Sequence, residues 1–586
     1  MLKILKYLKF KEWLLILVNI ALIAGQVWLD LKLPEYMSEI TKLIETPNSD
    51  IREIWQAGGY MLLCALSSAL LSVIVEFFVA KIAAGLSKRL REKIFDKVQS
   101  FSQDEINKFS TASLITRSTN DVAQVQGSIA MGLQVMIMAP ILATWAIIKI
   151  LGKSWQWSAV TAIAVLLLVI MITAIMLTAI PKFKKTQIYT DNLNRVTREN
   201  LTGLRVVRAY NAEKFEIQKF EKANSNLTNL HLFIYKTLAL MSPGMSLIMS
   251  GLSLSIYLIG AYLISATSLL NRLTVFSDMV VFSSYAMQVV MAFIMLTMIF
   301  LMLPRAIVSA KRINEVLSTK NKIVDGKSDG TSNLVGEIEF KYVGFKYPDA
   351  DEYVLKNISF TAHKGETVAF IGSTGSGKST LINLVPRFYD ATEGSVFIDN
   401  IDVRNYKLFD LHNKIGFVSQ KAVLFSGTVE SNVAFGDNSL GTPSEEEIAN
   451  ALQIAQAKTF VEKMEEKYKS HISQGGTNVS GGQKQRLSIA RAIARKPEIL
   501  IFDDSFSALD YKTDKKLRHT LNKTLFNTTW LIVAQRIGTI MNADKIIVLD
   551  NGEIVGVGTH SELLNNCKVY SEIAHSQLSK EELIDG

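Results

Sequence analysis

A short stretch in the second half of the chain has the residue types and the spacing of a phosphate-binding loop. It fits G-x-x-x-x-G-K-S and consists of Gly372, Ser373, Thr374, Gly375, Ser376, Gly377, Lys378 and Ser379. The apolar run ETVAFI precedes it and STLINLV follows it, so the loop is predicted to join a strand to a helix. Glycines let backbone N–H groups turn toward phosphate oxygens, and the helix N-terminus adds partial positive charge. We therefore predict that Lys378 reaches the β- and γ-phosphates of a nucleotide and that the Ser379 hydroxyl coordinates Mg²⁺.

Two adjacent carboxylates are a second candidate for metal binding. Asp503 and Asp504 follow the apolar run ILIF (499–502), which has the composition of a buried strand. A carboxylate at a strand tip beside a phosphate loop can hold Mg²⁺ through water, and we assign that role to Asp503. An Asp at this place could instead cap the following helix. The phosphate loop upstream favours the metal role.

The region around these motifs has the pattern of an α/β domain. Short apolar runs that are predicted strands, VAFI (368–371), SVFI (395–398) and ILIF (499–502), alternate with helical patterns. The polar stretch STKNKIVDGKSDGTSNLV precedes this region and is predicted to be a linker.

The first half of the chain is too apolar for an ordinary soluble protein. Hydrophobic residues make up 49% of the 586 residues and charged residues only 20%, against about a quarter in a typical soluble protein. The 10 Pro and 2 Cys exclude a disordered chain and a disulfide scaffold, and Cys64 and Cys567 are expected to be free thiols. Six runs are long enough to cross about 30 Å of hydrocarbon, near 13–38, 56–82, 124–150, 157–180, 234–265 and 278–304.

These runs predict a division of the chain into domains. Buried core helices of a large soluble protein are the alternative, but six spans of this length and purity disfavour them. We predict a membrane domain with six spans and two long cytoplasmic loops over 1–317, a linker over 318–335, a nucleotide-binding domain over 336–575 and a C-terminal tail over 576–586.

Basic residues predict how the spans are oriented. The connection between spans two and three and the connection between spans four and five are both rich in Lys and Arg, while the other connections are shorter or poorer in charge. By the positive-inside rule, both long loops and both termini are cytoplasmic. The net charge of +9 is then an inner-leaflet signature, and no nucleic-acid partner is needed to explain it.

Three features of the membrane domain have two interpretations each. The basic, apolar start MLKILKYLKFKEWLL favours a helix lying on the inner leaflet over a signal peptide, because no small-residue cleavage site follows. Glu76 is a candidate intramembrane charge or lies near the inner interface. A methionine stripe in the sixth span either lines a substrate pocket or packs against neighbouring helices, and it contains Met287, Met291, Met295, Met298 and Met302.

The run Val479–Arg486, VSGGQKQR, resembles the signature sequence of ATP-binding cassette (ABC) ATPases. With six spans before it, the whole chain resembles an ABC exporter half-transporter. The resemblance implies a polytopic α-helical membrane domain fused to an α/β P-loop ATPase domain, with ATP and Mg²⁺ as cofactors. It also implies nucleotide contacts from Tyr347, which stacks on adenine, from Thr380, and from Gln420, which contacts Mg²⁺ and senses the γ-phosphate.

The resemblance further implies that the chain dimerises. In this family ATP is held between one subunit's phosphate loop and the other subunit's signature, here Ser480, Gly481, Gly482 and Gln483, and a loop such as 507–510 crosses to the partner domain. TRSTNDV (116–122) and RENLTGLRVVRAYNAE (198–213) resemble the segments that couple spans to cassettes.

Three positions depart from the family pattern. Asp504 stands where competent members have Glu, so its carboxylate is one methylene further back, and Gln535 stands where a switch histidine is expected. Gln474 replaces a glutamate ahead of the signature. Because the signature itself is intact, the pattern predicts a heterodimer in which this chain's own ATP site is degenerate and its signature completes a competent site on a different half-transporter.

The resemblance gives a specific expectation for function. We expect an ATP-driven exporter subunit in a bacterial cell membrane, working on amphipathic drugs. A lipid or peptide exporter and a nucleotide-gated regulatory membrane protein are the alternatives.

Overall fold

The structure is a computed structural model that describes residues 2–46, 50–151, 153–268, 271–348, 350–437 and 439–578. The chain forms two compact units. The membrane unit comprises Met1–Gln99 and Thr111–Thr319, and the cassette unit comprises Ser100–Ser110 and Lys320–Gly586.

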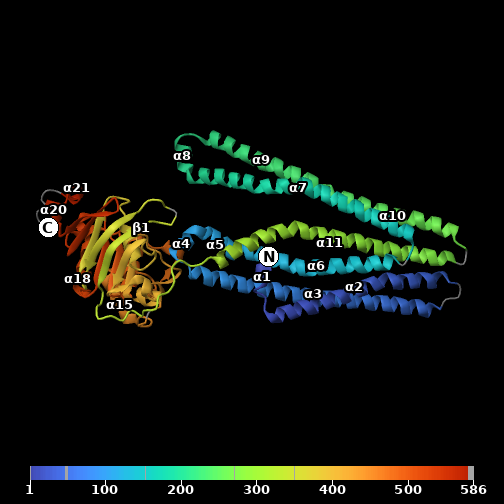
Figure 1. Cartoon of the computed structure of the whole chain (residues 1–586), viewed down its shortest axis with the longest axis horizontal. Helices are drawn as coiled ribbons and strands as arrows, with labels where there is room; N and C mark the ends of the chain where they lie inside the picture. Colours follow the sequence, from blue (N-terminus) through green and yellow to red (C-terminus); the bar gives the residue numbers. More distant parts are fainter. Residues whose placement is uncertain are drawn as a thin grey trace. The chain divides into compact units, whose positions relative to one another are not determined.

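Long helices build the membrane unit (Figure 1). They are α2 (Phe10–Glu45), α3 (Ile51–Gln99), α6 (Asn120–Leu151), α7 (Trp155–Thr202), α9 (Glu213–Ala239), α10 (Met241–Ala266) and α11 (Arg272–Ser318), with the shorter α1 (Leu2–Leu5), α5 (Thr111–Ser118) and α8 (Leu204–Ala209). Within the described residues, six helical stretches are long and apolar enough to cross a membrane, as predicted. At about 1.5 Å per residue, the 49 residues of α3 extend about 70 Å, well beyond the hydrocarbon core.

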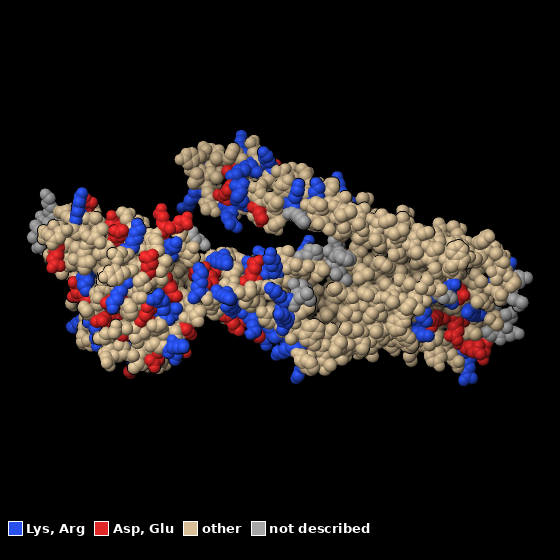
Figure 2. Space-filling view, viewed as in Figure 1, with Lys and Arg blue, Asp and Glu red and all other residues tan. Residues whose placement is uncertain are grey.

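The surface of this unit fits a lipid environment. Figure 2 shows a broad band of it without Lys, Arg, Asp or Glu on the visible face. Charged side chains near the ends of the long helices form ion pairs with residues of neighbouring segments. Lys149 Nζ lies 2.5 Å from Glu35 Oε1, and Lys153 Nζ lies 2.6 Å from Asp278 Oδ1. Glu76 is exposed on α3, and no described residue forms an ion pair with it.

The N-terminal segment packs partly against the bundle. Ile4 and Leu8 are buried, and Arg89 Nε donates to the Tyr7 carbonyl over 2.9 Å. Lys3 and Lys6 remain exposed. This amphipathic division agrees with a helix at the inner leaflet, which stays a prediction.

Two sheets form the cassette unit. The six-stranded sheet has the order β12-β11-β3-β10-β9-β6, in which β12 alone is antiparallel to its neighbour, and the antiparallel sheet has the order β2-β1-β4-β5. The strands are β1 (Ile338–Phe345), β2 (Leu355–Ala362), β3 (Thr367–Gly372), β4 (Glu393–Ile398), β5 (Ile401–Asp402), β6 (Ile415–Val418), β7 (Gly427–Thr428), β8 (His471–Ile472), β9 (Ile499–Asp503), β10 (Thr529–Val533), β11 (Lys545–Asp550) and β12 (Glu553–Gly558). The three predicted strands are confirmed as parts of β3, β4 and β9.

Helices of the cassette unit pack against the six-stranded sheet or against one another. They are α12 (Lys378–Leu384), α13 (Leu408–Lys414), α14 (Val429–Val433), α15 (Glu445–Ile454), α16 (Lys458–Val461), α17 (Gly481–Ala494), α18 (Tyr511–Thr524), α19 (Ile537–Ile540), α20 (His560–Asn566) and α21 (Lys568–Gln577). Because β3 and β9 both pair in parallel with β10, their carboxyl ends lie at one edge of the sheet. That edge carries the phosphate loop and Asp503.

The coupling role of 116–122 stays a prediction, and a different segment of the first half of the chain belongs to the cassette unit. It is Ser100–Ser110, which contains α4 (Gln103–Phe109). Glu105 Oε1 accepts a hydrogen bond from the Lys322 N–H over 3.1 Å. Residues 116–122 stay in the membrane unit, where Arg117 Nη1 donates to the Arg312 carbonyl over 2.7 Å. The prediction for 198–213 stays open.

Candidate functional site

The phosphate loop has a backbone that only glycine fits at two positions. Gly377, between the loop and α12, has φ +94°, and a Cβ there would lie 2.7 Å from Leu355 Cδ2. A Cβ on Gly372, at the end of β3, would lie 1.9 Å from the Leu549 carbonyl oxygen. These contacts hold the loop in a tight turn over the sheet edge, with Ser373, Thr374 and Gly375 exposed.

The Lys378 ammonium bends back over this loop. Its Nζ donates to the carbonyl oxygen of Gly372 over 2.9 Å and of Ser373 over 2.7 Å, and to Ser376 Oγ over 3.2 Å. Burial lowers the pKa of Lys378, and the carboxylates of Asp503 and Asp504 oppose that shift. A cation held above a loop of backbone N–H groups is the arrangement that a phosphate needs.

Oxygen donors that fit Mg²⁺ gather beside the loop. Ser379 Oγ donates to Asp503 Oδ1 over 2.7 Å, and Gln420 Nε2 donates to Oδ2 of the neighbouring Asp504 over 3.3 Å. Burial raises the pKa of Asp503, and the hydroxyl of Ser379 opposes the rise. Mg²⁺ prefers oxygen ligands and usually binds through one or two carboxylates plus substrate phosphates. The hydroxyl, carboxylate and amide oxygens present here fit that preference.

Two of the three departures from the family pattern contact each other. Asp504 Oδ2 accepts hydrogen bonds from Gln535 Nε2 over 2.9 Å and from Gln420 Nε2 over 3.3 Å. Asp504 has φ +47°, a left-handed conformation that Asp tolerates, and its N–H donates to the Val533 carbonyl over 2.9 Å. Burial raises the pKa of the Asp504 carboxyl, and the Gln420 amide opposes the rise. Gln474 is exposed and makes no hydrogen bond with this group in the described part of the chain.

Two tyrosine rings lie beside the first turn of α12. Tyr347 OH and Thr380 Oγ1 are hydrogen-bonded at 3.0 Å, so the ring is fixed to the first turn of α12. Tyr389, which sequence reasoning missed, meets Tyr347 edge-on with ring centroids 5.4 Å apart. The predicted adenine contact is therefore in reach of the phosphate loop.

The signature residues lie at the exposed start of α17. Ser480 is the N-cap, its N–H donates to Gln483 Oε1 over 2.8 Å, and its Oγ accepts from the Gln483 N–H over 3.3 Å. A Cβ on Gly481 would meet nothing within 4 Å, whereas one on Gly482 would lie 3.3 Å from the Ala508 carbonyl oxygen. The signature therefore lies beside the 507–510 loop with its first turn open to solvent.

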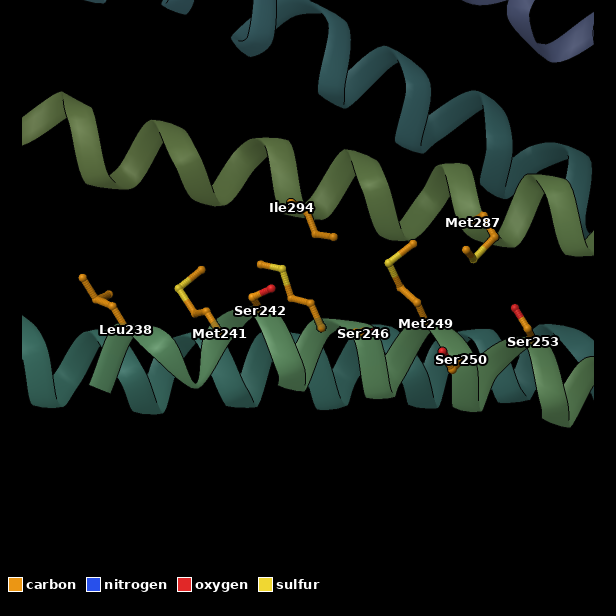
Figure 3. Close-up of a pocket in the computed structure, with 10 residues that line it drawn as sticks. Leu238, Met241, Ser242, Ser246, Met249, Ser250, Ser253, Met287 and Ile294 are labelled. Carbon is orange, nitrogen blue, oxygen red and sulfur yellow. The ribbon is translucent and has the colours of Figure 1, made fainter. Parts of the chain in front are cut away.

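A cavity of about 760 Å³ lies between α10 and α11 in the membrane unit (Figure 3). Among the described residues no charged side chain lines it, and the lining consists of Leu238, Met241, Ser242, Met245, Ser246, Met249, Ser250, Ser253, Met287 and Ile294. Of the predicted methionine stripe, Met287 lines the cavity and Met291 is exposed elsewhere, while the side chains of Met298 and Met302 lie outside the described residues. The sequence signal that was missed is the four-residue spacing of Met and of Ser along α10.

Comparison with known proteins covers both units. The family described as "ABC transporter transmembrane region" matches residues 14–293, and the family described as "ABC transporter" matches residues 355–507. The ABC transporter ATP-binding protein YfiB of Bacillus subtilis is 35% identical over 580 residues, covering 98% of this chain and 99% of the relative. An ATP-dependent lipid A-core flippase of Pseudomonas aeruginosa is 32% identical over 520 residues, covering 88% of this chain and 84% of the relative.

One solved structure shares the fold over nearly the full length. It is a bacterial Atm1-family ABC exporter with ATP bound, with a TM-score of 0.80 and 23% sequence identity, and the match covers 97% of this chain and 99% of that one.

Proposed function

The chain belongs to the ABC transporter family as a half-transporter of the exporter type, and from this premise we propose that it is the degenerate-site subunit of an asymmetric heterodimer. An ATP-driven ABC exporter needs two cassettes, and this chain carries one. The proposal states which protein supplies the second cassette and how fast each ATP site hydrolyses ATP.

The contact between Asp504 and Gln535 carries the proposal. One carboxylate oxygen of Asp504 accepts from two amides, Gln535 Nε2 and Gln420 Nε2. Both amides hold this oxygen of the shorter side chain, whose carboxylate is one methylene further back than that of Glu. A displacement of about 1 Å at a reacting group can slow chemistry about 100-fold. Gln535 can donate a hydrogen bond to a γ-phosphate but cannot accept a proton from it near neutral pH.

The remaining residues of this ATP site support binding. Lys378 and the loop N–H groups hold phosphates, Tyr347 packs on the base, and Ser379, Gln420 and Asp503 would hold Mg²⁺. The metal, when bound, neutralises charge on the phosphate oxygens. We infer that this site binds ATP and hydrolyses it slowly.

The intact signature supports a different partner. Ser480 and Gly481 are exposed and Gly482 and Gln483 are half-buried at a capped helix start, so this turn is available to a second cassette. The proposed partner has Glu and His at the positions equivalent to Asp504 and Gln535, and an altered signature of its own. The proposed complex lies in the bacterial cell membrane, in contact with lipid. Both termini of this chain are cytoplasmic, and no nucleic acid is a partner.

The membrane cavity supports uncharged or weakly charged amphipathic substrates, as in multidrug export. Flexible methionines at Met241, Met245 and Met249 adapt to different apolar shapes, and the serine hydroxyls beside them offer hydrogen bonds. A lipid exporter is the second candidate, favoured by relatives that are named as lipid A-core flippases. The absence of Lys and Arg among the lining residues does not favour an anionic headgroup in this cavity.

Single-turnover hydrolysis tests the heterodimer. The chain purified alone is expected to bind ATP with little turnover. In the complex with the partner, Asp504→Glu combined with Gln535→His is expected to raise hydrolysis at this site by roughly 10- to 100-fold. The two single substitutions are the matched controls, since each restores one group alone. Brisk turnover by the unsubstituted chain alone, or an unchanged rate in the double variant, would refute the degenerate-site assignment.

Transport in inverted vesicles tests the substrate class. ATP-dependent uptake of a neutral amphipathic dye is expected, and Met245→Glu, which places a charge in the cavity, is expected to reduce it. Ser265→Ala, on the same helix but outside the lining, is the control. ATP-dependent ion conductance without dye uptake would instead support a nucleotide-gated regulatory protein.

A further inference from the structure

The last turn of α21 bonds directly to the segment that carries Gln535. Gln577 Nε2 donates to the Gln535 carbonyl over 2.7 Å, and Gln577 Oε1 accepts from the Ile537 N–H over 2.9 Å. A carboxamide is suited to this position because it has a donor and an acceptor on one planar group. One side chain therefore fixes the backbone on both sides of Arg536.

The Ile537 N–H needs a partner from outside its own helix. Ile537 is the first residue of α19, and the N-cap residue Arg536 makes no side-chain capping bond. The first N–H groups of a helix have no intrahelical acceptor, and α19 is only four residues long. Gln577 therefore supplies from another element the cap that this short helix lacks.

The helix that carries Gln577 is firmly anchored. Tyr570 and Ala574 of α21 are fully buried in the cassette core, and Tyr570 OH is hydrogen-bonded to His560 Nδ1 at 2.6 Å. α21 also packs against β3, the strand that leads into the phosphate loop. A displacement of the Gln535 segment relative to the phosphate loop is thus opposed by a rigid support.

We propose that Gln577 is a positioning residue that holds Gln535 at the γ-phosphate end of the ATP site. Its two bonds fix the main chain of Gln535, whose own side chain donates to Asp504 Oδ2 over 2.9 Å. The C-terminal helix thereby sets how well this site distinguishes ATP from ADP. The inference concerns this chain's own ATP site, and it stands whether the second cassette is a different protein or a second copy.

Equilibrium binding of ATP and of ADP to the full-length chain in detergent tests this role. Gln577→Ala is expected to lower the ratio of ATP affinity to ADP affinity about three- to tenfold, as expected for the loss of one or two hydrogen bonds. The ADP affinity is expected to stay within about twofold, because ADP lacks the phosphate that Gln535 faces. Gln577→Glu keeps an acceptor for Ile537 but loses the donor to Gln535, so it is expected to lower the ratio as well.

Two controls separate positioning from general damage. Ser576→Ala removes a hydroxyl that bonds only within α21, to the Ile573 carbonyl over 2.7 Å, and is expected to change neither affinity. In a Gln535→Ala background, Gln577→Ala is expected to have no further effect on the ratio, because the side chain that it positions is gone. Equal losses of ATP and ADP affinity, an unchanged ratio, or full additivity of the two substitutions would each overturn the proposal.

Discussion

The two helix N-termini that carry the phosphate loop and the signature differ in how their first turn is completed. α12 begins after Gly377, which has no side chain to cap it, and Lys378 leans over the open loop. α17 begins after Ser480, which forms a reciprocal capping box with Gln483. The first N–H groups of α12 have no side-chain cap and can bind an anion. At the start of α17, a side chain of the helix itself caps the first turn. The difference supports the proposal that the start of α12 holds this chain's own ATP, whereas the signature serves a second cassette.

Glycine substitutions should give the largest difference in ATP affinity between the two helix starts. A Cβ at Gly377 would lie 2.7 Å from Leu355 Cδ2 and 2.9 Å from the Val354 carbonyl oxygen, at a positive φ, so Gly377→Ala distorts the loop. We expect ATP affinity to fall about 100-fold, as measured by equilibrium binding. Gly481→Ala is the matched control, since its Cβ meets nothing within 4 Å, and it should leave this chain's own ATP affinity unchanged. Comparable losses in both variants would show that the two helix starts are not distinct.

Removing one lysine at each helix start should have the next largest effect. Lys378→Gln removes the ammonium that faces the phosphates, and hydrogen bonds to charged groups contribute about 1.5–3 kcal/mol, so ATP affinity should fall roughly 10- to 100-fold. Lys484→Gln, in the first turn of α17, should leave ATP affinity of the isolated chain unchanged. Equilibrium binding of a fluorescent nucleotide measures both, and a loss with Lys484→Gln would place the signature at this chain's own nucleotide.

The capping box offers a smaller test. Ser480→Ala removes the acceptor for the Gln483 N–H, and the loss of an N-cap costs about 1 kcal/mol of folding free energy. The expected result is a drop in Tm of about 2–4 °C without a change in this chain's ATP affinity. Ser480→Asp keeps an acceptor at the cap and should retain the Tm. Scanning fluorimetry and nucleotide binding separate the two effects, and a weaker ATP affinity with an unchanged Tm would contradict the comparison.

The sequence alone predicted the parts of this site that depend on local pattern. The strand before Gly372, the strand before Asp503 and the helix start at Ser480 each follow from a motif with its flanking periodicity. The placement of Asp503 beside the phosphate loop also followed, because the carboxyl ends of parallel strands lie at one edge of a sheet. The six spans were predictable for a similar reason, since length and apolarity are local properties.

Features that depend on association between distant segments were not predictable. α4 has only seven residues and no strong periodicity, and its link to the cassette is a bond from Lys322 to Glu105 across 217 residues. Gln577 contacts a residue 42 positions away and carries no motif. The cavity beside Met245 depends on how α10 and α11 are placed against each other, which the pattern of either helix alone does not determine.

The smallest predicted effect is the pH dependence of folding stability that Asp504 causes. Burial raises the folded-state pKa of Asp504 above its ordinary value, against the opposing influence of Gln420, Arg536 and Lys378. A carboxyl with a raised folded-state pKa favours folding when it is protonated, and that contribution is lost as pH rises through the folded-state pKa. Ionised Asp504 therefore costs stability at neutral pH in the nucleotide-free protein.

Asp504→Asn removes that cost while keeping an oxygen that can accept from Gln535 and Gln420. At pH 7.5 the Tm of the nucleotide-free chain should rise by about 1–3 °C, since unpaired burial of charge is unfavourable. The advantage should shrink as the pH is lowered through the acid range in which Asp504 becomes protonated. Ser480→Asp, whose carboxylate is exposed at the other helix start, provides a reference without a buried charge. A stabilisation by Asp504→Asn that persists unchanged into acid would mean that packing rather than ionisation distinguishes the two regions.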